Sequence, residues 1–225
     1  MSPHRFIITG ASSGLGEALA KLALADGHEV VGVARRAEKL SYLSHSIAGD
    51  INEASTWDAI KKFAEGSNLP LVLINNAGAA KFGFFAESDH SDWVSNIETN
   101  LTAAMACTQA VLPSMLARGS GRILNVLSVA AKISLPGTAA YAASKAGLAA
   151  FSKVLREEVR TKGISITDAF PGAVNTPIWD PFESTPPRNE MITTESAAKI
   201  IYHALKAADD ATIDEITFTP IKGIL

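Results

Sequence analysis

A tyrosine and a lysine stand four residues apart, at Tyr141 and Lys145, in a stretch whose spacing predicts a helix. This spacing places both side chains on one face, about one turn apart. A free phenol has a pKa of about 10, too high for efficient proton transfer at neutral pH, and a neighbouring ammonium favours the phenolate. The pair therefore predicts an acid–base group, in which the lysine lowers the pKa of the tyrosine.

A glycine-rich turn follows the first apolar run, Phe6–Ile8, and precedes another stretch with helical spacing. Gly10 lets the chain turn tightly, Gly14 lets backbone N–H groups approach a pyrophosphate, and Gly16 lets the helix pack closely. The start of the helix adds partial positive charge and unpaired N–H donors. The turn predicts a phosphate cradle made of Gly10, Ser12, Ser13, Gly14, Leu15 and Gly16.

The spacing of this turn excludes other nucleotide-binding classes. It is G-x-x-x-G-x-G, not the G-x-G-x-x-G of the long dehydrogenases, and it lacks the Lys-Ser/Thr pair of a P-loop. Ser12 and Ser13 can add hydroxyl contacts to the ligand or cap the helix. An ATPase or a kinase is therefore excluded.

Polar residues at the ends of later strands complete the pattern. In chain order they are Asn75-Asn76-Ala77-Gly78, Asn100, Ser128, and then Tyr141 and Lys145 on the helix. With the glycine turn, this set resembles the main branch of the short-chain dehydrogenase/reductase family over nearly the whole chain. The resemblance implies an oxidoreductase that moves a hydride between a nicotinamide cofactor and a C=O or CH–OH group.

The resemblance also implies a role for each catalytic residue. Tyr141 gives a proton to the developing alkoxide, and Ser128 donates a hydrogen bond to the substrate oxygen. Lys145 holds the nicotinamide ribose and, together with the positive ring of the oxidised cofactor, lowers the pKa of Tyr141. Asn100 supports a water that passes protons to Lys145.

Further cofactor contacts carry over from the family. Asn76 ties adjacent strands together, while Ala77 and Gly78 leave room for the adenosine half of the cofactor. Asp50, followed by Ile51, takes the place of the acid that contacts the adenine. The segment expected against the nicotinamide, where Thr176 reaches the carboxamide, contains Pro171, Gly172, Val174 and Thr176.

The end of the second strand indicates which dinucleotide is bound. An NAD site usually has an acid there, but this strand ends in Arg35 and Arg36, and no acid follows until Glu38. Guanidinium groups bind a 2′-phosphate, which a carboxylate would repel. Members of the family that bind NADP have a second basic residue just before the second glycine of the turn. This chain has Ser13 there, so only one of the two basic positions typical of NADP binding is basic here. We expect NADPH in preference to NADH.

The elements that must position these residues alternate along the chain. Short apolar runs predict strands at Phe6–Ile8, Glu29–Val33, Leu71–Ile74, Arg122–Leu127, Ile164–Asp168 and Glu215–Phe218, with His45–Ala48 as a weaker candidate. Helical spacing covers Leu15–Ala25, Ala54–Glu65, Trp93–Arg118, Ala139–Lys162 and Thr194–Ala207. We expect an α/β fold: one Rossmann-type domain over residues 1–225, with a doubly wound parallel sheet of about seven strands and helices on both faces.

Composition narrows the class of protein. The 225 residues carry a net charge of −3 without a basic block, so no nucleic-acid partner is expected. No signal peptide and no apolar run of about 18 residues is present, which argues against a membrane. The five histidines are scattered, so no metal is expected, and the single cysteine, Cys107, suits a reducing compartment. The predicted location is cytoplasmic.

The substrate is indicated only by apolar residues in loops. Candidate walls are Phe82, Phe84, Phe85, Ile133, Leu135, Ile178, Trp179 and Phe182, with residues 175–193 as a lid. They favour a hydrophobic or partly aromatic carbonyl substrate, although ordinary packing explains them equally well. Relatives suggest a homodimer or homotetramer. Two alternatives stay open: an NAD-linked alcohol dehydrogenase, and a dinucleotide sensor without turnover.

Overall fold

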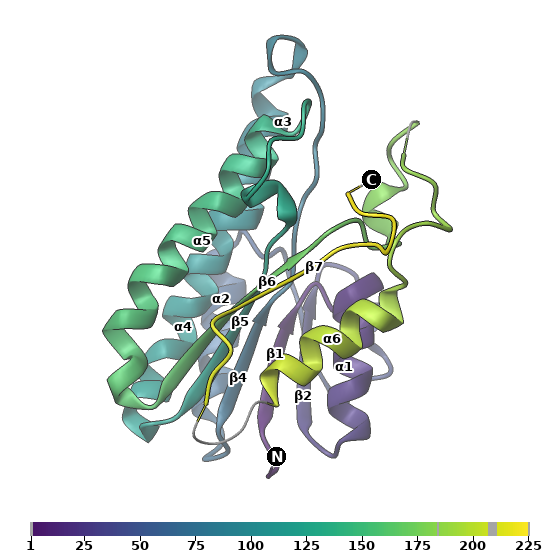
Figure 1. Ribbon diagram of the computed structural model, residues 1–225. Coiled ribbons are helices and arrows are strands. Elements are labelled where there is room, and N and C mark those ends of the chain that lie inside the picture. Colours follow the sequence, from purple (N-terminus) through teal and green to yellow (C-terminus); the bar gives the residue numbers. More distant parts are fainter. Residues whose placement is uncertain (1, 184, 207–210, 225) are drawn as a thin grey trace.

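The computed structural model describes residues 2–183, 185–206 and 211–224, and its centre is one seven-stranded parallel sheet (Figure 1). The strand order is β3-β2-β1-β4-β5-β6-β7. The strands are β1 (Arg5–Thr9), β2 (Glu29–Ala34), β3 (His45–Ala48), β4 (Leu71–Asn75), β5 (Gly121–Val126), β6 (Ile164–Pro171) and β7 (Glu215–Phe218). All six neighbouring pairs are parallel, so the predicted doubly wound sheet is confirmed.

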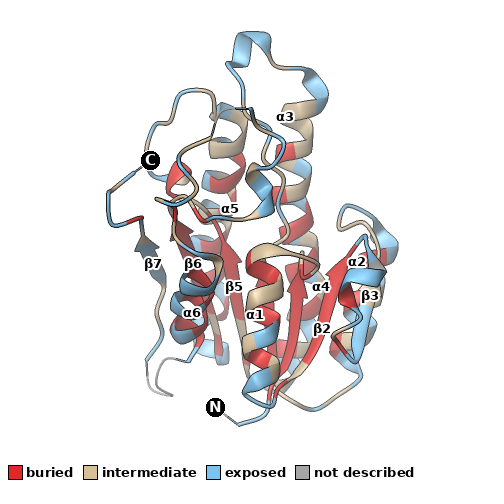
Figure 2. Cartoon of the chain, turned by 90° about the vertical axis from the view of Figure 1, so that its right-hand side faces the viewer, coloured by how far each residue is buried: buried red, intermediate tan, exposed pale blue. Residues whose placement is uncertain are grey.

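Helices cover both faces of the sheet because its strands are apolar on both faces. Alternate residues of β1 show this: Phe6 and Ile8 pack in the cluster with α1 (Gly14–Ala25) and α6 (Thr194–Leu205). Ile7 packs in the cluster with α2 (Ala54–Glu65), α4 (Ala103–Arg118) and α5 (Ala139–Val159). Figure 2 shows the central strands buried, the edge strands β3 and β7 largely exposed or half-buried, and the outer surfaces of the helices exposed. Among the described residues, no helix is long and apolar enough to cross a membrane.

The helices differ from the predicted ones mainly at their ends. They are α1 (Gly14–Ala25), α2 (Ala54–Glu65), α3 (His90–Ile97), α4 (Ala103–Arg118), α5 (Ala139–Val159) and α6 (Thr194–Leu205). A 3₁₀ turn, Arg160–Lys162, completes the stretch predicted as one helix from Ala139. The helix predicted to reach Ala207 ends at Leu205, and residue 207 lies outside the described residues.

The largest difference lies within the helix predicted over Trp93–Arg118. The helical stretch begins at His90, and a π-helical turn, Glu98–Thr102, separates α3 from α4. A π turn contains one extra residue and is frequent at functional sites. Here it contains Asn100, whose buried carboxamide is held by bonds to other elements.

Candidate active site

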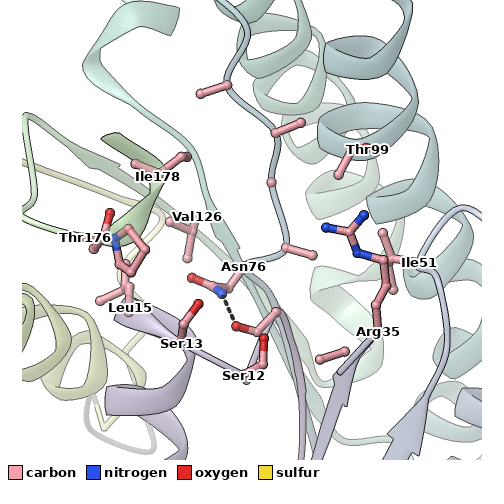
Figure 3. A pocket seen from close by; sticks show the side chains of 18 of the residues that line it. Ser12, Ser13, Leu15, Arg35, Ile51, Asn76, Thr99, Val126, Thr176 and Ile178 are labelled. Atoms are coloured by element: carbon pink, nitrogen blue, oxygen red, sulfur yellow. Dashed lines mark hydrogen bonds between the residues drawn. The ribbon is translucent and has the colours of Figure 1, made fainter. Parts of the chain in front are cut away.

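A cavity of about 980 Å³ lies at the carboxyl end of the sheet (Figure 3). The glycine turn after β1 and the segment after β4 both line it, and the strand order reverses between these two strands. In open α/β sheets this switch point is where ligands bind. The predicted residues that line the cavity are Gly10, Ser12, Ser13, Gly14, Leu15, Arg35, Arg36, Asp50, Ile51, Asn76, Ala77, Gly78, Tyr141, Lys145, Pro171, Gly172, Val174 and Thr176.

Three predicted residues lie outside this lining: Gly16, Asn100 and Ser128. Gly16 packs behind the turn, where an added Cβ would collide with the Asn76 side chain and the Gly10 carbonyl. Gly10 itself has φ +69, a left-handed conformation that favours glycine. The turn thus has the tight shape that a phosphate cradle requires, and α1 begins directly behind it. Ser13 precedes α1, but its side chain does not cap the helix.

Asn76 ties the ends of β1 and β4 together, as expected. Its Nδ2 donates to the Thr9 carbonyl oxygen at 2.9 Å. The Thr9 hydroxyl oxygen in turn accepts hydrogen bonds from the backbone N–H groups of Asn76 and Ala77, each at 3.0 Å. Sequence analysis missed Thr9, although a hydroxyl directly before the first glycine of the turn is a usable signal.

Tyr141 and Lys145 both line the cavity from the first turns of α5. The Lys145 Nζ lies 5.8 Å from the centre of the Tyr141 ring and donates to the Val126 carbonyl oxygen at 2.8 Å. Lys145 is only 5% exposed, and its burial lowers the pKa of the ammonium to about 8. A group that titrates near 8 can exchange a proton close to neutral pH.

Sequence analysis expected Lys145 to lower the pKa of Tyr141, but in the structure this pKa is raised. Burial raises the pKa of the phenol, and a hydrogen bond with Ser128 offsets part of that effect. The structure therefore brings Ser128 and Tyr141 together. Ser128 lies two residues after the end of β5 and caps a 3₁₀ turn, Val129–Ala131, where its hydroxyl oxygen accepts from the Ala130 N–H at 3.2 Å. A phenol with a raised pKa keeps its proton at neutral pH.

Asn100 lies behind the cavity and holds its wall. Its Oδ1 accepts from the Ala79 N–H at 2.8 Å, and its Nδ2 donates to the Ala79 carbonyl at 2.9 Å and to the Ser144 hydroxyl at 3.0 Å. Asn96, four residues earlier, binds the N–H and carbonyl of Lys81 in the same way, at 3.1 and 2.9 Å. The two carboxamides clamp the extended segment 79–81 as a neighbouring strand would. Sequence analysis missed Asn96, although the four-residue spacing on one helix face was visible.

The two arginines after β2 are exposed at the edge of the cavity. Figure 3 shows the Arg35 side chain extending from the end of β2 toward the wall that carries Ile51 and Thr99. Arg36 donates to the Ser12 hydroxyl across a long 3.5 Å contact. The Asp50 carboxylate accepts from the Asn52 N–H at 3.0 Å, which fixes the loop after β3.

The segment after β6 is anchored by an arginine that sequence analysis missed. Arg188 Nη1 donates at 3.0 Å to the Thr176 carbonyl and to the Asn175 side chain, and its Nη2 pairs with Asp180 at 2.9 Å. Thr176 also donates its hydroxyl to the Val174 carbonyl at 3.4 Å. Arg188 thus ties Asn175, Thr176 and Asp180 together beside the cavity.

The predicted apolar walls do not all lie together. Phe82 packs on the ring of Tyr141, and two rings of the loop after β6, Trp179 and Phe182, pack on Phe82. Phe84 and Phe85 are 64% and 63% exposed and, together with Phe82, line a separate cavity of about 200 Å³. Of the remaining candidates, Ile178 lines the main cavity, and Ile133 and Leu135 do not.

Comparison with known proteins gives consistent matches. A sequence model described as short chain dehydrogenase matches residues 4–187. Ketoacyl reductase HetN of Nostoc sp. is 35% identical and aligns with 89% of this chain and 74% of its own length. A short-chain dehydrogenase structure from Streptomyces avermitilis has TM-score 0.85 and 30% identity, covering 96% of this chain and 88% of that one. Another from Sphingobium yanoikuyae, in complex with NADPH, has TM-score 0.84 and 27% identity, covering 95% and 87%.

Proposed function

This chain belongs to the short-chain dehydrogenase/reductase family of NAD(P)-dependent oxidoreductases, and on that basis we propose that it is an NADPH-dependent reductase of ketones or aldehydes. One feature supports this function above the others. Tyr141 carries a raised pKa, is hydrogen-bonded to Ser128, and lies beside the buried ammonium of Lys145 at the edge of the cavity. This arrangement supplies a proton donor and an oxyanion partner to one substrate oxygen.

The residues that would hold the cofactor fit a dinucleotide. A side chain at Gly16 would fill the space where the turn packs, and the first turn of α1 lines the cavity with its N–H groups available to phosphate oxygens. Asn76, Ala77 and Gly78 also line the cavity, with Asn76 and Ala77 packed against Gly10 of the turn, and Thr176 lies directly beside Gly14. When bound, the reduced nicotinamide supplies the hydride that the carbonyl carbon accepts.

The chain's own residues supply the proton and the orientation. The Tyr141 hydroxyl gives its proton to the carbonyl oxygen, and the Ser128 hydroxyl donates a hydrogen bond to the same oxygen as negative charge develops. Lys145, held at the Val126 carbonyl, stabilises the phenolate that remains. Asn100 fixes the neighbouring wall and, through Ser144, the start of α5. Its role in a water-mediated proton relay stays a prediction.

The preference for NADPH rests on the two arginines at the cavity edge and on the NADPH bound to a similar dehydrogenase. The test is a titration with NADPH and with NADH, followed by reduced-nicotinamide fluorescence. We expect NADPH to bind more tightly, and Arg35→Ala to weaken NADPH binding without affecting NADH. Lys39→Ala, an exposed neighbour outside the cavity lining, is the control. Tighter binding of NADH by the unaltered protein would favour the NAD-linked alcohol dehydrogenase instead.

Turnover is tested by removing the proposed proton donor. Tyr141→Phe should lower the rate of carbonyl reduction by about 100-fold or more while NADPH binding is retained. Tyr202→Phe removes the same hydroxyl on α6, where it donates to Asp26, and is the matched control. Equal activity of the two variants would refute Tyr141 as the proton donor. It would then favour the alternative of a dinucleotide sensor without turnover.

The proposal extends to the substrate, the oligomeric state and the cellular location. The apolar rings packed on and beside Phe82, which contacts Tyr141, support an apolar substrate, with residues 175–193 as its lid. Exposed apolar side chains on α4 and α5, such as Met105 and Val154, support a homodimer or homotetramer, which sedimentation equilibrium would detect. The one cysteine, Cys107, is buried as a free thiol and suits a reducing, cytoplasmic compartment.

A further inference from the structure

The loop that follows β2 contacts the glycine turn at two successive residues. The Tyr42 hydroxyl donates to the Ala11 carbonyl oxygen at 2.8 Å, and this contact is partly buried. Arg36 Nη2 donates to the Ser12 hydroxyl oxygen at 3.5 Å, and this contact is exposed at the edge of the cavity, which both residues line. The first contact therefore joins the loop to the turn beside the second.

The ring of Tyr42 is held in place by apolar packing. It packs against the buried cluster that includes Ala11, Leu40 and Leu43. Gly32 on β2 permits this packing, because a Cβ there would lie 2.5 Å from the Leu43 side chain and 3.0 Å from the Cβ of Ala11. Burial raises the pKa of the Tyr42 phenol to about 12, so its hydroxyl remains a hydrogen-bond donor at neutral pH.

The bond from Tyr42 restrains the peptide group between Ala11 and Ser12. A peptide group is planar, so its carbonyl and its N–H cannot turn independently of each other. Because Tyr42 holds the Ala11 carbonyl, the plane of this peptide is fixed, and the Cα of Ser12 is fixed with it. Tyr42 thus sets the position of Ser12 on the turn, and the loop that Tyr42 anchors also carries Arg36.

Arg36 and Ser12 together suit a phosphate group. Residues 10–16 of the turn include no lysine or arginine, so a phosphate at this edge of the cavity meets only neutral donors on the turn. A hydroxyl and a guanidinium 3.5 Å apart can both donate to one phosphate, whose oxygens accept several hydrogen bonds. The separation between the two groups then decides whether both of them reach the phosphate.

We propose that Tyr42 is a positioning residue for NADPH, which holds Ser12 and Arg36 at the separation at which both donate to the 2′-phosphate. This inference rests on the proposed preference for NADPH. Without the bond to Ala11, the loop and the turn move independently, and binding must order them at a cost in affinity. NADH has a hydroxyl in place of the 2′-phosphate, so its affinity depends far less on this arrangement.

The test is Tyr42→Phe, which removes the hydroxyl and keeps the packed ring. Dissociation constants of NADPH and NADH are measured by reduced-nicotinamide fluorescence. The loss of one hydrogen bond corresponds to about two- to twelvefold, so we expect Tyr42→Phe to weaken NADPH binding by that factor and to leave NADH binding unchanged. Tyr202→Phe is the matched control, since it removes a hydroxyl that donates to Asp26 outside the cavity lining and should change neither constant. Circular dichroism verifies that both variants fold.

A second comparison separates positioning from a general loosening of the site. Tyr42→Phe is combined with Arg36→Ala, and the loss of NADPH affinity that Tyr42→Phe causes is measured with and without Arg36. If Tyr42 acts through the arrangement of Arg36 and Ser12, its hydroxyl contributes nothing once Arg36 is absent, and the two losses do not add. Residues that act independently would give additive losses.

Three outcomes would contradict the inference. Additive losses, or an equal loss for NADPH and NADH in Tyr42→Phe, would show that Tyr42 only supports the fold of the turn, while the NADPH preference of the unaltered protein would stand. An unchanged NADPH constant in Tyr42→Phe would overturn the inference in the same way. Tighter binding of NADH by the unaltered protein would instead refute the NADPH preference itself, and the inference with it.

Discussion

Replacing Lys145 by methionine tests how its burial affects stability. Burial lowers the pKa of this ammonium from 10.5 to about 8, a difference that corresponds to about 3 kcal/mol. The unfolded chain has a pKa near 10.4 for the same group. Between pH 8 and 10.5 the unfolded state therefore binds more protons, and the stability of the native state rises with pH in that window. Below pH 8 both states are charged, and the destabilisation is fully present.

Lys145→Met removes this titration and keeps the length of the side chain. From pH 7 to pH 9.5, we expect the unfolding free energy of the native sequence to rise by about 2 kcal/mol relative to that of Lys145→Met. Other titrating groups contribute equally to both proteins and cancel. Urea denaturation followed by circular dichroism at the two pH values measures the shift.

The matched control is Lys153→Met on the same helix, where the side chain is 63% exposed and makes a 3.7 Å contact with Glu215. Exposed pairs of this kind contribute little, so the pH dependence should stay close to that of the native sequence. A difference for Lys145→Met that does not change with pH would refute the reasoning. It would mean that Lys145 is not desolvated in solution.

Three further predictions concern the cradle and the core. Gly16→Ala adds a Cβ that collides with Asn76 and should cost about 1–3 kcal/mol of unfolding free energy and weaken NADPH binding; unchanged values would refute the close packing. Thr9→Val leaves the N–H groups of Asn76 and Ala77 without their acceptor and should cost about 1–3 kcal/mol by urea denaturation. Cys107, whose pKa burial raises to about 12, should resist iodoacetamide at pH 8 until urea unfolds the chain; rapid native labelling would contradict its burial.

The sheet could be predicted from sequence because its signal is local. Uninterrupted apolar runs such as Leu71–Ile74 are typical of strands buried on both faces. The weaker candidate, β3, is mostly exposed at the edge of the sheet. The π turn Glu98–Thr102 could not be predicted in this way. One extra residue in a turn changes the hydrogen-bond pattern without interrupting a helical stretch.

Site residues could be predicted where their chemistry depends on side-chain type, and not where it depends on the backbone. Asn96 and Arg188 bind main-chain carbonyls or N–H groups of distant residues, so the sequence does not reveal their partners, although the four-residue spacing of Asn96 and Asn100 was a visible signal. The spacing of Tyr141 and Lys145 correctly predicted their proximity. It could not predict that burial would dominate the pKa of Tyr141, because burial depends on the surrounding elements.

A buried position whose side chain contributes only to packing is unfavourable for lysine, because its ammonium loses contact with water. An apolar side chain at position 145 would avoid the desolvation that lowers the pKa of its ammonium, so stability alone does not explain the lysine. Its Nζ is nevertheless held at the end of β5, beside a tyrosine that is itself bonded to Ser128. A protein that only bound a dinucleotide would need the lysine for the ribose but not the buried phenol and its hydroxyl partner. The three groups together therefore support the proposed proton transfer, which is why Tyr141→Phe is the decisive variant.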